Sequence, residues 1–241
     1  MDYSLLFDAH THFHEGMGEG QKFCLSGYSH KSNAEVLQKI PALENACFSL
    51  GLGPQEIQRD DLHPDFEASL QDAILQIEGQ KENPLFAAVG EVGLDNHWGK
   101  TPEQRFRQFE AFERMISLSK KLGKAIVVHS RDAENECIAQ LLAAECKKVM
   151  MHCFSGKLEE AKRAADAGFY ISIPPLKNKE RKKIIKEIDL DYLLVESDAP
   201  YLGKKSADAY FSAKMIAEYK NLKIEGVLDS TAQNARKLFG V

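Results

Sequence analysis

Eight short apolar segments recur along this chain, and longer segments with helical periodicity lie between most of them. The predicted strands occupy residues 5–7, 23–25, 47–50, 86–89, 125–128, 149–151, 170–173 and 193–195. The predicted helices occupy residues 64–77, 102–122, 133–144, 158–167, 179–188, 207–219 and 228–239. Strands that alternate with helices are typical of parallel sheets, and eight such strands predict an α/β fold of the (β/α)8 TIM barrel type.

One barrel accounts for the whole chain, because barrels of this kind commonly reach 241 residues without dividing. We therefore expect a single domain over residues 1–241, with the helix at 228–239 capping the barrel. Residues 15–41 form the least regular part, with Gly16, Gly18, Gly20 and Gly27 close together. We expect a mobile loop over the functional site there.

Net charge, cysteine pattern and the length of apolar runs indicate which partners and compartment to expect. The formal net charge is −5, from 31 basic and 36 acidic residues, so the chain has no general electrostatic attraction for nucleic acid. The five cysteines include no CxxC pair, and no apolar run approaches the ~18 residues of a membrane span. We expect a soluble cytoplasmic protein that is monomeric and has no membrane partner.

Histidines and carboxylates follow five of the apolar segments. In a barrel the carboxyl ends of all strands meet at one face, so these side chains would converge there. Along the first strand, alternation places Asp8, His10 and His12 on one side, where the two imidazoles can bind one ion. The pattern predicts a centre for two divalent metal ions, with these ligands: His10, His12, Glu91, His129, His152 and Asp198.

Glu91 follows a buried strand, where a carboxylate needs a cationic partner. Its two oxygens can bridge two ions, although a salt bridge to an arginine is the simpler alternative. His129 and His152 end successive apolar runs and would bind the second ion. Either one alone is more often a hydrogen-bonded core histidine, but two equivalent positions favour a metal site.

Asp198 precedes Ala199 and Pro200 and suits a catalytic base. A carboxylate beside a metal ion can orient a water molecule and take its proton. Glu196 lies two residues earlier and points the same way, so we expect it to hold a ligand histidine in its tautomer. Asp198 and Glu91 are the predicted catalytic residues.

Five motifs carry a resemblance to a known family. They are Asp8-Ala-His10-Thr-His12, Gly90-Glu91-Val-Gly93-Leu-Asp95, His129-Ser-Arg131-Asp-Ala133, His152-Cys-Phe-Ser-Gly156 and Glu196-Ser-Asp198-Ala-Pro200-Tyr201-Leu202. In order and spacing they resemble the TatD family of metal-dependent hydrolases, and Thr231, Asn234, Leu238 and Phe239 resemble its C-terminal signature. The likeness spans almost the whole chain.

The resemblance implies an amidohydrolase-like barrel and, for most members, a metal-dependent deoxyribonuclease, with some deacylases. It implies His10, His12, Glu91 and Asp198 around one ion. Glu91, His129 and His152 would surround the other. Imidazole-rich ligation favours Zn²⁺, Mn²⁺ or Ni²⁺, and the nuclease resemblance keeps Mg²⁺ among the candidates.

The chain also departs from the family pattern at the expected substrate rim. A Gly-x-His-Pro segment is usual after the third strand, whereas here Gly53 stands where the histidine would be. The loop after Leu202 is shortened to residues 203–206. Arg131 is a candidate phosphate contact because its guanidinium matches phosphoryl oxygens, although a bridge to a carboxylate is equally compatible. His97, in a loop after Asp95, is a second substrate-binding candidate.

Two enzyme classes and one non-enzyme class fit these observations. A two-metal pair suits in-line attack on phosphate, so hydrolysis of phosphodiesters in DNA or a small phosphoester is the leading hypothesis. The same centre would serve a carboxylic ester, amide or lactone. The trimmed substrate loops also allow a binding protein that keeps its metals without catalysis, although the retained Asp198 argues for an enzyme.

Overall fold

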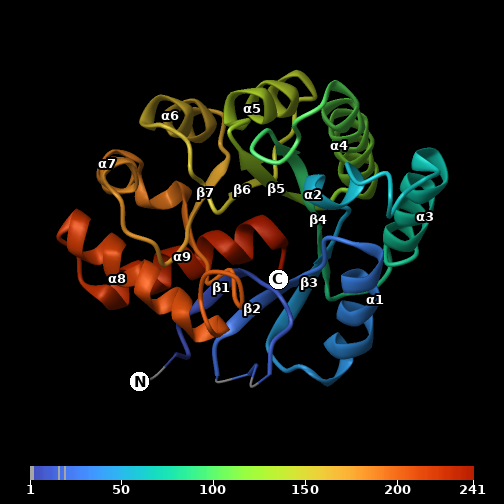
Figure 1. The fold of residues 1–241 in the computed structure, drawn as a ribbon. Helices are drawn as coiled ribbons and strands as arrows, with labels where there is room; N and C mark the ends of the chain where they lie inside the picture. The colour runs from blue at the N-terminus through green and yellow to red at the C-terminus, as the bar shows by residue number, and fades with distance from the viewer. Residues whose placement is uncertain (1–2, 16, 19) are drawn as a thin grey trace.

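Eight parallel strands pair in the order of the sequence, from β1 to β8 (Figure 1). The computed structural model describes residues 3–15, 17, 18 and 20–241. The strands are β1 (Phe7–Thr11), β2 (Lys22–Ser26), β3 (Ala46–Leu50), β4 (Phe86–Asp95), β5 (Ala125–Arg131), β6 (Val149–His152), β7 (Tyr170–Ile173) and β8 (Leu193–Val195). Each predicted strand overlaps an observed one, which confirms the TIM barrel.

Backbone hydrogen bonds beyond the end of β8 bring the last strand back to the first. The Asp198 amide donates to the carbonyl of His10 at 3.0 Å, and the His12 amide donates to the carbonyl of Ala199 at 2.7 Å. The ring is therefore nearly closed, and it is joined at the carboxyl ends of its strands. Residues separated by most of the chain become neighbours at that end.

Helices surround the strands (Figure 1). The α-helices are α1 (His30–Lys39), α2 (Pro54–Ile57), α3 (Phe66–Glu78), α4 (Pro102–Leu122), α5 (Glu134–Ala143), α6 (Leu158–Asp166), α7 (Lys179–Glu187), α8 (Ala209–Lys220) and α9 (Ile224–Phe239). Short 3-10 turns occur at η1 (Ile40–Ala42), η2 (Leu190–Tyr192) and η3 (Ser206–Asp208). All seven predicted helices are present, with α9 beginning four residues early.

The expectation of an irregular loop over residues 15–41 is wrong for most of that segment. It contains strand β2 and helix α1, whereas Gly16 lies outside the described residues. Helix α1 buries Asn33 and Val36, so its sequence carries little apolar periodicity. It is held instead by a capping box between Ser29 and Ser32 and by the Asn33 amide, which donates to the Gly51 carbonyl at 2.9 Å.

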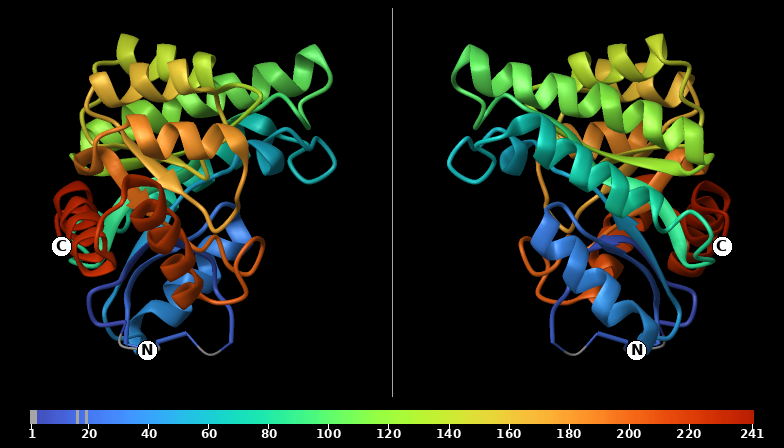
Figure 2. Two further views of the ribbon diagram at one scale, coloured as in Figure 1. Left: turned by 90° about the vertical axis from the view of Figure 1, so that its left-hand side faces the viewer. Right: turned by 90° about the vertical axis from the view of Figure 1, so that its right-hand side faces the viewer.

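Helix α9 covers the amino ends of the strands. Its side chains Ala232, Ala235, Leu238 and Phe239 join a buried cluster with inward-facing strand residues such as Phe7. The Phe7 and Phe239 rings lie 6.0 Å apart. Figure 2 shows α9, in red, at the opposite end of the barrel from the loops that follow β3 and β8. The predicted cap is confirmed, and the functional loops are left at the other end.

The five cysteines are free, and four of them are buried. Within the described part of the chain, no helix combines the length and the apolar character that a bilayer crossing requires.

Candidate metal centre

The predicted ligands come together at the carboxyl ends of the strands. They are contributed by β1 (His10), the residue after its end (His12), β4 (Glu91), β5 (His129), β6 (His152) and the turn after β8 (Asp198). Among the described residues, groups of these side chains place their ligand atoms within 4.8 Å of one another. His10 is fully buried, while the Glu91 side chain is 12 % exposed, so the cluster opens at one side.

In the first group, two carboxylate oxygens lie near two histidine nitrogens. His10 Nε2 and His12 Nε2 lie 3.2 Å apart. Glu91 Oε2 lies 3.5 Å from His10 Nε2 and 3.7 Å from His12 Nε2. Asp198 Oδ1 lies 3.8 Å and 3.5 Å from the same two nitrogens.

These separations fit the edges of a coordination polyhedron better than direct hydrogen bonds. Ligands at about 2.1 Å from one ion lie about 3.0 to 3.4 Å apart in right-angle or tetrahedral geometry. A hydrogen bond between a ring nitrogen and a carboxylate would be shorter, at about 2.8 Å. The His10–His12 separation of 3.2 Å falls within that range, and the separations from the two carboxylates, 3.5 to 3.8 Å, are slightly wider than ligands around a single ion.

Hydrogen bonds to Nδ1 hold the imidazole rings of His12 and His10 in position. His12 Nδ1 donates to the Ser26 carbonyl at 2.9 Å, because a carbonyl can only accept. The Nε2 lone pair of a neutral His12 is then free for a metal ion. The Ser26 hydroxyl lies 3.1 Å from His10 Nδ1 and fixes the position of that ring, with Nε2 toward His12.

The second group is built on the other oxygen of Glu91. Its Oε1 lies 2.9 Å from His129 Nδ1, and His129 Nε2 lies 3.0 Å from Asp95 Oδ2. His152 Nδ1 donates to Glu196 Oε2 at 3.0 Å, so Glu196 holds this ring as expected. Its effect on the tautomer of the metal-free histidine stays a prediction. The His152 and His10 ring centroids lie 3.7 Å apart, and His152 groups with His10 and Asp198 as well as with Glu91 and His129.

Gly90 and Gly93 allow β4, the strand that carries Glu91, to pack closely against β5. A Cβ on Gly93 would lie 2.0 Å from the carbonyl oxygen of His129, and one on Gly90 would lie 2.6 Å from Val127. Both glycines also have positive φ angles, of 154° and 138° for Gly90 and Gly93. Any larger residue would separate β4 from β5, and Glu91 from His129.

The cluster balances its own charge. Burial alone would raise the pKa of Glu91, but its interactions with His10 and His129 hold it well below its usual value. Burial likewise disfavours charge on His129, yet Asp95 and Glu91 raise its pKa to about 9. For His152, the charge and hydrogen bond of Glu196 overcome burial and raise the pKa to about 10.

The first group differs in its protonation. Burial and the neighbouring His152 lower the pKa of His10, so this imidazole is neutral. Burial opposes ionisation of Asp198, but its contacts with His12 and His152 lower its pKa below the usual value. A neutral imidazole beside an ionised carboxylate is the donor set that a divalent transition metal binds.

Asp8 does not face the cluster, contrary to the expectation from strand alternation. Its Oδ1 accepts from the Ser197 amide at 2.8 Å, and its Oδ2 accepts from the Ser197 hydroxyl at 2.6 Å. Burial raises its pKa to about 8. Asp8 fixes the turn that carries Asp198 and does not contribute a ligand atom to the groups described above.

The two substrate-binding candidates lie on the loops around the centre. Arg131 is exposed at the last position of β5. His97 lies in the turn after β4, where its Nδ1 is 3.4 Å from Asp132 Oδ2 and its ring meets Trp98. Neither side chain belongs to the ligand groups, and their roles remain predictions.

Sequence reasoning assigned no role to Asp95 and overlooked the tyrosines beside His12. Asp95 accepts from Gln55 Nε2 at 2.7 Å as well as facing His129. Its position at the end of β4 was the available signal, because side chains at strand ends line this face. The rings of Tyr28 and Tyr201 contact His12 at centroid distances of 5.2 and 5.1 Å.

Comparison with known proteins agrees with this geometry. The model of the TatD related DNase family matches residues 7–240. The chain belongs to the TatD family. The uncharacterized metal-dependent hydrolase YabD of Bacillus subtilis is 30 % identical, over 98 % of this chain and 100 % of that protein. The TatD resemblance is confirmed, and the chain is a metal-dependent hydrolase.

Two further TatD relatives bear on substrate and fold. Human deoxyribonuclease TATDN3 is 34 % identical over 77 % of this chain and 69 % of its own length. The crystal structure of YJJV, a TatD homologue from Escherichia coli K12, superposes with a TM-score of 0.83 over 99 % of both chains. Its sequence identity is 21 %, so this likeness concerns the fold.

Replacing Glu91 by glutamine tests whether the two groups share this side chain. We expect Glu91→Gln to lose at least one metal ion with little loss of thermal stability, because a neutral amide is a poor bridge between cations. Elemental analysis of the purified variant gives the metal content. Glu136→Gln, on the exposed face of α5, is the matched control and should keep full occupancy; full occupancy in Glu91→Gln would contradict the shared role.

Metal binding should also release protons. With pKa values of about 9 and 10, His129 and His152 are protonated at pH 7 and must lose a proton to bind a cation. We expect release of about two protons at pH 7, so that affinity rises with pH up to about pH 10. Calorimetric titration in buffers of different ionisation enthalpy counts them. His30→Gln should leave the count unchanged, and an affinity that is flat or falls with pH would disprove the assignment.

Proposed function

We propose that this TatD protein hydrolyses phosphodiester bonds in DNA at a centre of two divalent metal ions. One observation supports the two-ion centre above the others. The two oxygens of Glu91 face different histidine groups, with Oε2 toward His10 and His12 and Oε1 toward His129. A carboxylate in that position can serve two cations at once.

In this proposal His10, His12, Glu91 and Asp198 hold one ion. Glu91, His129 and His152 hold the other. Four imidazoles favour Zn²⁺, Mn²⁺ or Ni²⁺ over Mg²⁺. When bound, the ions would polarise the scissile group and make water acidic enough to attack at neutral pH.

Asp198 is the proposed general base. Its carboxylate is ionised at neutral pH, since its pKa lies below the usual value, so it can accept a proton from the attacking water. The turn that holds it is fixed by the bond from its amide to the His10 carbonyl and by Asp8 on Ser197. This anchoring keeps the carboxylate oriented toward the histidines during proton transfer.

DNA is the proposed substrate because the human relative carries the name deoxyribonuclease. The net charge of −5 requires that phosphate contacts be local. Arg131, exposed at the end of β5, is the proposed phosphate contact, because its guanidinium can donate two parallel hydrogen bonds to a phosphoryl group. His97 could donate to substrate from the loop after β4.

A substrate panel tests the proposed bond type. Metal content of the purified protein is measured first, and the panel is then run with that metal on DNA, bis(p-nitrophenyl) phosphate, p-nitrophenyl acetate and a lactone. We expect cleavage of the phosphodiesters, abolished by a chelator and restored by the metal. Turnover of the carboxylic ester or lactone alone would instead identify a carboxyl hydrolase.

The Asp198→Asn variant tests whether the protein is an enzyme or a binding protein. We expect Asp198→Asn to lower kcat by roughly 10²- to 10⁴-fold, the usual contribution of a general base. Asp166→Asn, at the exposed end of α6 far from the site, is the control and should retain activity. If the metal-loaded wild-type protein cleaves no panel substrate and Asp198→Asn changes only partner affinity, the protein is a binder and not an enzyme.

A further inference from the structure

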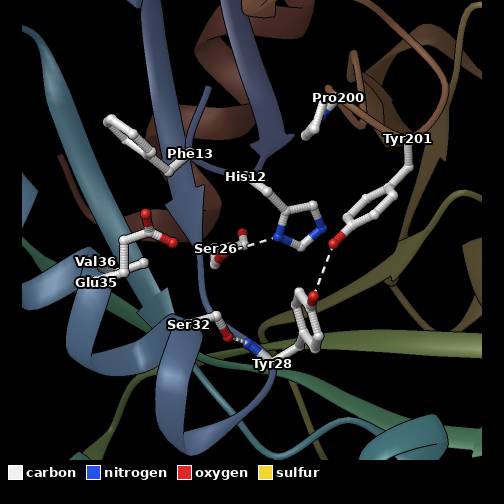
Figure 3. A pocket seen from close by; sticks show the side chains of 9 residues that line it. All are labelled: His12, Phe13, Ser26, Tyr28, Ser32, Glu35, Val36, Pro200 and Tyr201. Carbon is white, nitrogen blue, oxygen red and sulfur yellow. Dashed lines mark hydrogen bonds between the residues drawn. The ribbon is translucent and has the colours of Figure 1, made fainter. Parts of the chain in front are cut away.

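Two tyrosines from opposite ends of the chain meet at the edge of the candidate centre. Tyr28 follows β2, and Tyr201 belongs to the turn after β8. Their hydroxyl oxygens lie 2.7 Å apart, which is a short hydrogen bond. Figure 3 shows the two phenols directed at one another beside the ring of His12.

The pair lies toward the metal-facing side of His12. His12 Nδ1 is turned to Ser26, and the hydroxyl pair lies toward the Nε2 side of the ring (Figure 3). Both phenol rings meet the imidazole edge-on, with interplanar angles of 88° for Tyr28 and 74° for Tyr201. A group bound at the first ligand cluster would therefore have these hydroxyls as neighbours.

The hydroxyl pair has one proton that is not used in its own hydrogen bond. Two phenols carry two hydroxyl protons, and the bond between them uses one. A phenol has an ordinary pKa of about 10, so both hydroxyl protons are retained at neutral pH. The second proton is free to point away from the pair, and Tyr201 is 61 % exposed, so a ligand can reach it.

Tyr28 lies against the position where the sequence lacks an expected histidine. The Gly53 amide donates to the Tyr28 carbonyl at 2.8 Å. A Cβ at Gly53 would be in ordinary van der Waals contact with Tyr28 Cβ and the Tyr28 carbonyl oxygen, each at 3.4 Å. The backbone hydrogen bond therefore ties the loop after β2, which carries Tyr28, to the loop after β3.

A cavity of about 80 Å³ lies beside the pair, lined by both tyrosines together with His12, Ser26, Ser32 and Pro200. It has room for a few water molecules. Glu35 also lines it, and His12 is the one candidate metal ligand among its lining residues, so the phosphoryl group is expected on the Nε2 side of His12 and not in this cavity.

We propose that the Tyr28–Tyr201 hydroxyl pair donates a hydrogen bond to a non-bridging phosphoryl oxygen of the substrate. An oxyanion beside His12 would be bound by one neutral donor from the rim in addition to the metal centre. This inference rests on the proposed phosphodiesterase function for the identity of the substrate oxygen.

The first test needs no turnover. The affinity of the metal-loaded protein for inorganic phosphate is measured by calorimetry for wild type, Tyr28→Phe, Tyr201→Phe and the double variant. A hydrogen bond to a charged acceptor contributes roughly tenfold to a hundredfold in affinity, so the double variant should lose about that much. Each single variant should lose less, because the remaining hydroxyl can still donate. Metal content should be unchanged in all of them.

The second test pairs the hydroxyls with the substrate oxygen. A dinucleotide phosphodiester is compared with its two phosphorothioate diastereomers, since sulfur accepts hydrogen bonds poorly. For one diastereomer the wild-type enzyme should lose more kcat/KM on sulfur substitution than the double phenylalanine variant does. A purely structural role of the tyrosines would lower both rates equally and leave this difference at zero.

Tyr192→Phe, in η2 at the opposite end of the barrel, is the matched control and should behave as wild type in both tests. If wild type cleaves phosphodiesters and the double variant keeps its phosphate affinity and its sulfur effect, the inference is wrong while the proposed function stands. If phosphodiesters are not cleaved but phosphate affinity depends on the tyrosines, the proposed function fails and the oxyanion donor stands.

Discussion

The join between the first strand and the turn after the last one determines the geometry of the whole site. Two backbone hydrogen bonds link His10 and His12 to Asp198 and Ala199. The Asp8 side chain reinforces them by accepting two hydrogen bonds from Ser197. These contacts close the barrel and, in the same step, bring a carboxylate from the end of the chain to two imidazoles from its beginning. The ligand cluster is thus a consequence of ring closure, because neither half of the chain could assemble it alone.

Burial of the charged side chains in that cluster is electrostatically unfavourable, and the fold offsets it by pairing each of these charges. Isolated carboxylates at this depth would be strongly disfavoured. Glu91 instead faces His10 and His129, while Glu196 faces His152 and accepts from the Ser172 hydroxyl. His129 and His152 carry protons where a cation would bind, so the protein holds positive charge at the centre with or without metal. This exchange of protons for metal lets the site exist as a stable part of the fold.

The strands and most of the candidate metal ligands could be predicted from the sequence, because the end of a strand is a local feature of the chain. An apolar run that ends at His129 or His152 indicates both a strand and a side chain at the carboxyl end of the barrel. Asp8 shows the limit of such reasoning. Alternation placed it on the same side as His10, but its partner Ser197 lies 189 residues away and becomes a neighbour only on closure. Helix α1 escaped prediction for a related reason, since it is held by caps and by Asn33 rather than by an apolar stripe.

The rim of the site is less predictable than its metal centre for a chemical reason. A metal ion demands particular donor atoms at fixed spacing, so its ligands leave a recognisable pattern of residues. A substrate oxygen demands only a hydrogen-bond donor at a suitable place, and any loop that reaches there can provide it. At Gly53 the sequence shows a loss, whereas the structure brings Tyr28 into van der Waals contact with that position and directs its hydroxyl at Tyr201. A motif residue that is missing at the rim therefore does not by itself indicate a missing function, because another loop at the same face can present a donor to the substrate.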